Sequence, residues 1–207
     1  MLDDFEIQRI IRYMIHMYRY DNIGLTIGST TGVRLFVTCD TSFACHKDMK
    51  SHTGGTIHLG PEFGSFSSLS EKIKLQPDSS AAAEGLGCHI NVRKALPIRY
   101  YLEELWHIQN EPTRVAMDNV PFMQAILGEK GYSKFLKHVL IRVRVANDAL
   151  ENKEITLEHL DTEDMPADTL TKALTNAPFH RHRRVLLGAD PVKIAAEYIR
   201  DPALHSH

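Results

Sequence analysis

The chain has few cysteines and no long apolar run. Its 207 residues include only three cysteines, Cys39, Cys45 and Cys88, too few and too odd in number for a disulfide scaffold. No apolar stretch approaches the roughly 18 residues that a membrane-spanning helix needs. The acidic start, Met1–Glu6, does not fit a secretory signal. These absences predict a soluble intracellular protein from a reducing compartment, with no membrane partner.

The chain also has almost no net charge. The formal value is −2, so any contact with nucleic acid must come from local basic patches. The hydrophobic content of 43% is enough for a packed core and too high for disorder, and the length suits one domain with appendages. The spacing of Cys39, Cys45 and His46 matches no standard four-ligand zinc site.

The pattern of apolar and turn-forming residues predicts an α/β fold. Three β-prone segments near residues 33–39, 55–59 and 60–70 are separated by glycine and serine, which predicts an antiparallel meander. Alternation of strands and helices then follows, and it predicts a five-stranded mixed sheet flanked by helices. The expected later elements are helices at 79–94 and 98–106 separated by Pro97, a strand at 113–117, helices near 121–127 and 134–150, a strand at 155–160, and a helix from Pro166.

Both ends of the chain are predicted to lie outside this sheet. Residues 5–20 carry apolar side chains at helical spacing, so they form an amphipathic helix that either packs on the domain or once joined a preceding domain. A basic run at 180–184 either contacts nucleic acid or forms an exposed turn. We therefore divide the chain into an N-terminal helix and linker (1–32), a central domain (33–176) and a basic, helical C-terminal extension (177–207).

Four acidic residues lie where predicted strands end and predicted helices begin. Asp40 and Asp118 each follow an apolar run, Glu84 lies in an alanine-rich helix start, and Asp168 lies at the start of a later helix. Carboxylates at such places can converge although they are far apart in sequence. Hard divalent cations such as Mg²⁺ prefer oxygen ligands of this kind. The four acids together predict a metal site, although any one of them alone would be read as a solvated surface residue.

Six short motifs, in their expected order, resemble the ribonuclease H domain of copia-type (pseudovirus-class) retrotransposon Pol polyproteins. The resemblance covers about residues 5–188, and the last motif is the most specific of the six. The helix at 5–20 then resembles the segment that joins the polymerase to the ribonuclease H. The six motifs are Thr38–Ala44, Asp48–Gly55, Ser79–Glu84, Met117–Asn119, Lys137–Arg142 and Thr162–Lys172.

The resemblance implies a ribonuclease H-like fold and a metal-dependent endonuclease that cleaves the RNA strand of RNA/DNA hybrids during reverse transcription. Asp40, Glu84, Asp118 and Asp168 would hold two Mg²⁺ or Mn²⁺ ions. Asp40 would bridge the ions, because it should lie in the middle strand of the sheet. Integrases and transposases of this fold carry their glutamate last, whereas here the glutamate comes second and an aspartate last.

The resemblance also implies partners and substrate contacts. Ser51, Thr53 and Asn119 would contact the RNA strand, while Lys137, His138 and Arg142 would form a basic patch for the DNA strand or else a solvated helix face. The expected partners are the hybrid itself and the reverse transcriptase domain of the same polyprotein. The expected location is the cytoplasm, within virus-like particles, or the nucleus.

Some residues depart from the family pattern. Ala81 and Ala82 replace a Thr-Glu pair, Leu140 stands in place of an aspartate, and Gly85 and Gly87 follow Glu84 within a predicted helix. Each of these glycines costs about 1 kcal/mol relative to alanine. These departures keep an alternative open, in which the chain is a catalytically degenerate or co-opted module with a structural or nucleic-acid-binding role.

Overall fold

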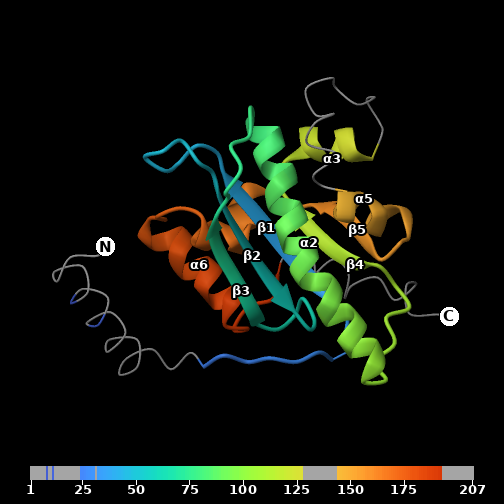
Figure 1. The fold of residues 1–207 in the computed structure, drawn as a ribbon. Helices are drawn as coiled ribbons and strands as arrows, with labels where there is room; N and C mark the ends of the chain where they lie inside the picture. The colour runs from blue at the N-terminus through green and yellow to red at the C-terminus, as the bar shows by residue number, and fades with distance from the viewer. Residues whose placement is uncertain (1–7, 9–10, 12–23, 31, 128–143, 193–207) are drawn as a thin grey trace.

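The computed structural model describes residues 8, 11, 24–30, 32–127 and 144–192 (Figure 1). Most of the helix predicted at 5–20, the first ten residues of the one predicted at 134–150, and residues 193–207 of the predicted C-terminal extension lie outside these ranges. Within them, no helix has both the length and the apolar character needed to cross a membrane.

Five strands form one mixed sheet, which confirms the predicted architecture (Figure 1). They are β1 (Phe36–Ser42), β2 (His52–His58), β3 (Ser65–Lys72), β4 (Thr113–Met117) and β5 (Ile155–His159). The first three pair antiparallel, and β4 pairs parallel with both β1 and β5. The spatial order is β3-β2-β1-β4-β5, so β1 is the central strand.

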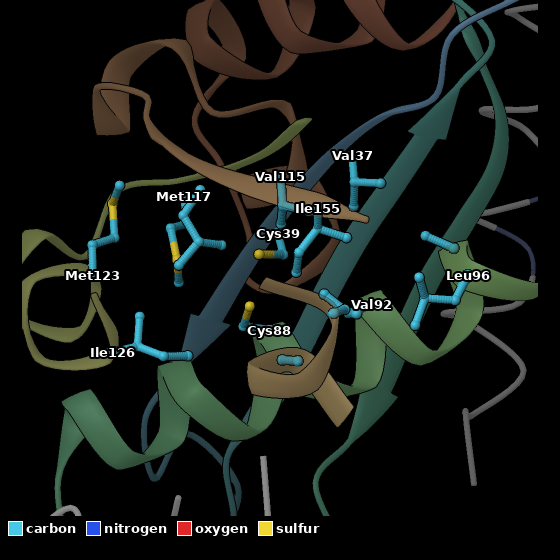
Figure 2. Close-up of a cluster of buried hydrophobic side chains, with 14 of the residues drawn as sticks. Val37, Cys39, Cys88, Val92, Leu96, Val115, Met117, Met123, Ile126 and Ile155 are labelled. Atoms are coloured by element: carbon cyan, nitrogen blue, oxygen red, sulfur yellow. The ribbon is translucent and has the colours of Figure 1, made fainter. Parts of the chain in front are cut away.

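Helical elements cover both faces of this sheet. The larger core lies under α2 (Ser80–Glu104), α3 (Val120–Ile126) and α5 (Arg144–Glu151), where the sulfurs of Cys39 and Cys88 meet between β1 and α2 (Figure 2). On the other face, Phe36 packs with residues around η2 (Pro166–Leu170) and α6 (Asn176–Leu186). The short helix η1 (Thr162–Asp164) precedes η2. Because β1 is covered on both faces, its first six residues are all buried.

The helix α2 is one unbroken helix, whereas the sequence predicted two helices separated by Pro97. The helix begins after Ser79, whose Oγ accepts a hydrogen bond from the Ala82 backbone N–H at 3.2 Å, and it ends at Glu104. A proline in a helix removes one backbone hydrogen bond. Buried Val92 and Leu96 pack into the core just before Pro97, and this tertiary packing holds the helix together across the missing bond.

The two glycines after Glu84 allow α2 to lie close to its neighbours. A Cβ atom on Gly87 would lie 2.0 Å from Thr41 Oγ1 of β1, and one on Gly85 would lie 2.7 Å from Phe122 Cε2 of α3. Real Cβ atoms essentially never make such contacts. The glycines therefore serve packing, and their cost in helix propensity does not indicate a degenerate sequence.

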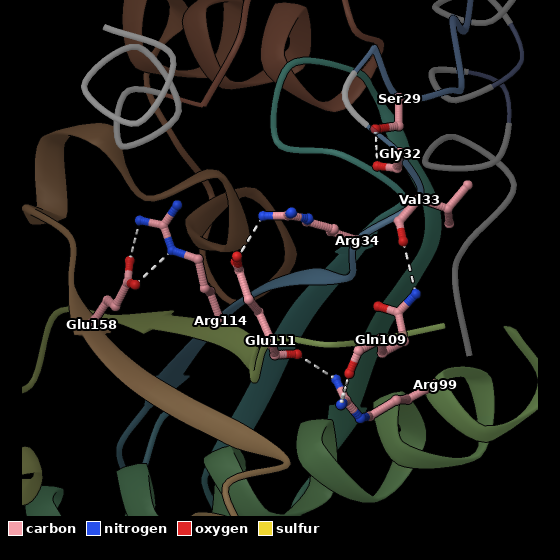
Figure 3. Close-up of polar contacts among 9 residues, drawn as sticks. All are labelled: Ser29, Gly32, Val33, Arg34, Arg99, Gln109, Glu111, Arg114 and Glu158. Carbon is pink, nitrogen blue, oxygen red and sulfur yellow. Dashed lines mark hydrogen bonds and ion pairs between the residues drawn. The ribbon is translucent and has the colours of Figure 1, made fainter. Parts of the chain in front are cut away.

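A polar network fixes the end of the sheet at which β1 begins (Figure 3). The buried Arg99 of α2 donates hydrogen bonds to the carbonyl oxygens of Gln109 and Glu111, at 2.6 and 2.9 Å. The Gln109 amide donates to the Val33 carbonyl at 2.7 Å, and the Glu111 carboxylate pairs with Arg34 at 2.7 Å. This network connects the C-terminal part of α2 to the segments that precede β1 and β4.

A substitution at Gly87 tests the packing of α2. We expect Gly87→Ala to lower the free energy of unfolding by about 1–3 kcal/mol, although alanine favours helices, because its methyl group would clash with Thr41. Urea denaturation measures this change. The control is Gly24→Ala, since a Cβ there would meet no heavy atom within 4 Å. Equal stability of the two variants would contradict the close packing.

Candidate metal centre

Three of the four acids come together at one edge of the sheet. Asp40 lies near the end of β1, and Asp118 directly follows the parallel strand β4. The ends of neighbouring parallel strands meet at the same edge, and the beginning of α2 brings Glu84 there. One carboxylate oxygen from each of Asp40, Glu84 and Asp118 lies within 4.8 Å of the other two.

The fourth acid, Asp168, adjoins this group through a lysine. Lys172 Nζ lies 3.0 Å from Asp168 Oδ2 and 3.9 Å from Asp40 Oδ2. Asp168 belongs to η2, which packs on β1 and β2. Gly54 of β2 makes this possible, since a Cβ there would lie 2.8 Å from Leu170 Cβ. The four predicted residues therefore share one site, and their role as metal ligands stays a prediction.

Two threonines and an asparagine hold the carboxylates or their neighbours in place. Thr171 Oγ1 donates a hydrogen bond to Asp40 Oδ2, and Thr162 Oγ1 donates to Asp118 Oδ2 at 2.8 Å. The side-chain oxygen of Asn119 accepts from the Phe122 N–H at 2.9 Å and so caps α3. Such outer contacts orient the ligands of metal sites.

Thr162, Thr171 and Lys172 are site residues that the sequence alone did not predict. A signal was available, because all three lie in the most specific motif, Thr162–Lys172. Lys172 also follows Asp168 by four residues, the spacing at which oppositely charged side chains pair on a helix.

Burial and mutual repulsion shift the protonation of the acids. Burial, together with the charges of Asp40 and Asp118, raises the pKa of Glu84 to about 9. Burial and the charge of Asp40 raise the pKa of Asp168 to about 7, against the opposing effect of Lys172. Burial alone would lower the pKa of Lys172, but Asp40 and Asp168 raise it above its ordinary value. The centre therefore needs more positive charge than Lys172 supplies.

The residues present fit a hard divalent cation. Among the described residues, Glu84 Oε2 and Asp168 Oδ1 are buried oxygens without a hydrogen-bond partner. Buried polar groups without partners are costly, and a cation would satisfy both oxygens. The ligands are all carboxylate oxygens, as Mg²⁺ and Mn²⁺ prefer.

Two of the residues that were expected to contact the substrate are buried. Ser51 and Thr53 are 0% exposed. Ser51 Oγ accepts a hydrogen bond from the Ala44 N–H, and Thr53 Oγ1 donates to the Asp40 carbonyl. A buried hydroxyl offers no surface to a duplex, so we assign both a structural role in place of the expected substrate contact. Contact between Asn119 and the RNA strand stays a prediction. Lys137, His138 and Arg142 lie outside the described residues.

Comparisons with known proteins identify the fold. No protein-family model matches the chain. Ribonuclease H1 from the halophilic archaeon Halobacterium salinarum NRC-1 superposes with a TM-score of 0.50 at 13% identity, covering 67% of this chain and 94% of that one. LC11-RNase H1, isolated from compost, gives a TM-score of 0.50 at 16% identity, covering 67% and 92%. The chain thus has a ribonuclease H-like fold, as predicted.

The raised pKa values predict that the metal-free protein loses stability as the pH rises. The pKa values of about 9 for Glu84 and about 7 for Asp168 lie above the ordinary values of 4.5 and 3.8, so folding favours the protonated forms. This contribution is complete below about pH 4 and is lost as the pH passes through 7 and then 9. Buried His58, whose pKa burial lowers to about 4, acts in the opposite direction between about pH 4 and 6.5. In chelator, we therefore expect the Tm to fall by roughly 5 °C between pH 5 and pH 8.

Circular dichroism melts of native protein and Glu84→Gln measure this effect. The variant carries no titratable group at that position, so its Tm should change less between the two pH values. An identical pH dependence in the two proteins would show that Glu84 does not titrate as described.

Proposed function

We propose that the chain is a ribonuclease H, a metal-dependent endonuclease that cleaves the RNA strand of RNA/DNA hybrids. The observation that carries this proposal is the convergence of Asp40, Glu84 and Asp118 within 4.8 Å, with Asp168 joined to Asp40 through Lys172. The ribonuclease H-like fold and the order of the acids in the sequence support it. The order of the acids also speaks against an integrase-like nuclease, in which the glutamate would come last.

The arrangement suits two ion positions that share Asp40. Asp40, Glu84 and Asp118 would hold one ion, Mg²⁺ or Mn²⁺, and Asp40 and Asp168 would hold the second. When bound, such a pair supplies a nucleophile at neutral pH and neutralises charge on the leaving oxygen. The hydrogen bonds from Thr171 and Thr162 fix the orientation of Asp40 and Asp118, so that the oxygens stay aimed at the common centre.

The degenerate alternative loses its main support. Gly85 and Gly87 are explained by close packing, and Ala82 is buried against Ile73 and Leu86, so a larger residue at position 82 would not fit. Leu140, another departure that motivated the alternative, lies outside the described residues.

The ordered motifs support a retroelement context. We propose that the partner is the reverse transcriptase domain of the same polyprotein, that residues 1–32 resemble the connection to it, that 33–176 form the nuclease domain, and that 177–207 form an extension. The enzyme would act in the cytoplasm, within virus-like particles, or in the nucleus.

We further propose that α6 contacts the nucleic acid backbone. A hollow of about 510 Å³ adjoins Asp168, and its walls include Arg181 and His182 of α6. The basic run at 180–184 is thus part of a helix and not an exposed turn. Within the described part of the chain, Arg181 forms no ion pair and no hydrogen bond through its side chain, so its guanidinium is available for a phosphate.

Cleavage of a labelled RNA/DNA hybrid with Mg²⁺ or Mn²⁺ tests the activity. We expect Asp40→Asn, Glu84→Gln, Asp118→Asn and Asp168→Asn each to lower the rate by roughly 10³-fold or more, because the ligands act as a unit. The control is Asp48→Asn, whose carboxylate pairs with Lys72 at 2.7 Å on the surface. A folded native chain that binds neither ion and cuts no hybrid would rule the proposal out.

Two arginines of α6 test the backbone contact. Arg181→Gln should weaken hybrid binding and reduce the slope of log K against log salt by about 0.7–0.9, because one phosphate contact is lost. Arg184→Gln removes the same charge from the same helix, but Arg184 is held by Asp190 at 2.7 and 2.9 Å, so its slope should not change. Fluorescence anisotropy at several salt concentrations gives both slopes. Equal slopes for the two variants would show that the hollow holds no phosphate.

A further inference from the structure

Lys172 places a positive charge among the carboxylates. Its ammonium lies 3.0 Å from Asp168 Oδ2 and 3.9 Å from Asp40 Oδ2. Of the basic residues that the structure describes, it alone forms an ion pair with any of the four acids. The ammonium thus contacts both of the carboxylates that would hold a second divalent ion.

The backbone holds the start of this side chain, while its end reaches the surface. The Lys172 N–H donates to the Asp168 carbonyl at 3.1 Å, and the preceding residue, Thr171, donates its hydroxyl to Asp40 Oδ2. The Lys172 side chain is 40% exposed, whereas those of Asp40 and Asp168 are 5% and 6% exposed. The ammonium can therefore swing into solvent on its flexible four-carbon stem while Thr171 keeps Asp40 in place.

The Lys172 ammonium and a second divalent ion would compete for the same two carboxylates, those of Asp40 and Asp168. Magnesium lies about 2.0–2.1 Å from its oxygen ligands, so an ion bound to both Asp40 and Asp168 would lie close to the ammonium. Like charges at such a distance repel strongly where water is scarce. Binding of the ion thus requires the ammonium to leave.

We propose that Lys172 is a displaceable counter-cation, which holds Asp40 and Asp168 together in the metal-free protein and gives way when a second divalent ion binds. This inference rests on the proposed function only in assuming a divalent-ion site. It predicts that the two ions bind with unequal affinity. The ion held by Asp40, Glu84 and Asp118 binds more tightly, because the other must first displace Lys172. A substrate phosphate adds negative charge beside the centre and would so favour the second ion.

Direct Mn²⁺ binding to the full chain, without nucleic acid, tests this role. Electron paramagnetic resonance of free Mn²⁺ gives the number of bound ions and their affinities independently of turnover. We expect Lys172→Gln to bind the second ion about tenfold more tightly or better, whereas the first ion should change little. The metal-free variant should also have a lower Tm than native protein, and saturating Mn²⁺ should remove that difference.

Two control variants separate this effect from a general loss of charge. Lys72→Gln removes the same charge, but Lys72 pairs with Asp48 at 2.7 Å on the surface, so its Mn²⁺ binding should match that of native protein. Lys172→Arg keeps a cation at the site and should keep the weak second affinity.

The remaining outcomes distinguish this inference from the proposed function. Second-ion affinity in Lys172→Gln that is equal to or weaker than native, with the first ion intact, overturns the role of Lys172. Tighter binding by a chain that cuts no hybrid supports the role of Lys172 and counts against the enzyme. Absence of any bound ion in native protein and variant alike overturns both.

Discussion

The constraint on which this structure depends is the mutual repulsion of carboxylates that lie together in a buried site. Asp40 and Asp168 are almost fully buried, and so is Glu84. Burial and the charge of Asp40 together raise the pKa values of Glu84 and Asp168. Such a cluster persists only if the surrounding fold is stable enough to hold it and if positive charge is close by. Lys172 supplies one such charge, and the unpartnered oxygens of Glu84 and Asp168 indicate that more is needed. The divalent ions that we propose for this site would meet that need.

The fold holds the cluster by bringing two helical layers unusually close to the middle of the sheet. On one face, Gly87 lets α2 approach β1, and Asn91 of α2 donates hydrogen bonds to the Gly87 and Gly54 carbonyl oxygens at 2.9 and 3.3 Å. A Cβ on Gly55 would lie 1.7 Å from Asn91 Oδ1. On the other face, Gly54 leaves room for η2. Small residues in β2 and α2 thus determine how far Glu84 and Asp168 can reach towards Asp40.

The prediction errors have a common physical cause. Pro97 is a strong local signal for a helix break, yet the packing of Val92 and Leu96 keeps α2 whole. Ser51 and Thr53 have the polar side chains of a substrate-contacting loop, yet both are buried. In each case the residue has the local property on which the prediction rested. Tertiary packing, which a local sequence pattern does not contain, decided the structure instead.

The sequence by itself determined the strands, their mixed arrangement and the four acids at strand ends and helix starts, because periodicity, turn residues and ordered motifs are local features of the chain. It also contained Thr171 and Lys172 within the motif that carries Asp168. Only the tertiary structure decided that Lys172 lies between Asp168 and Asp40, that Thr171 bonds to Asp40, and that the glycines after Glu84 serve packing. Both contacts with Asp40 join residues more than a hundred positions apart, and the glycine contacts join separate layers of the fold. Distances of that kind depend on how closely helices and sheet pack, and side-chain volume at a few glycines sets that closeness.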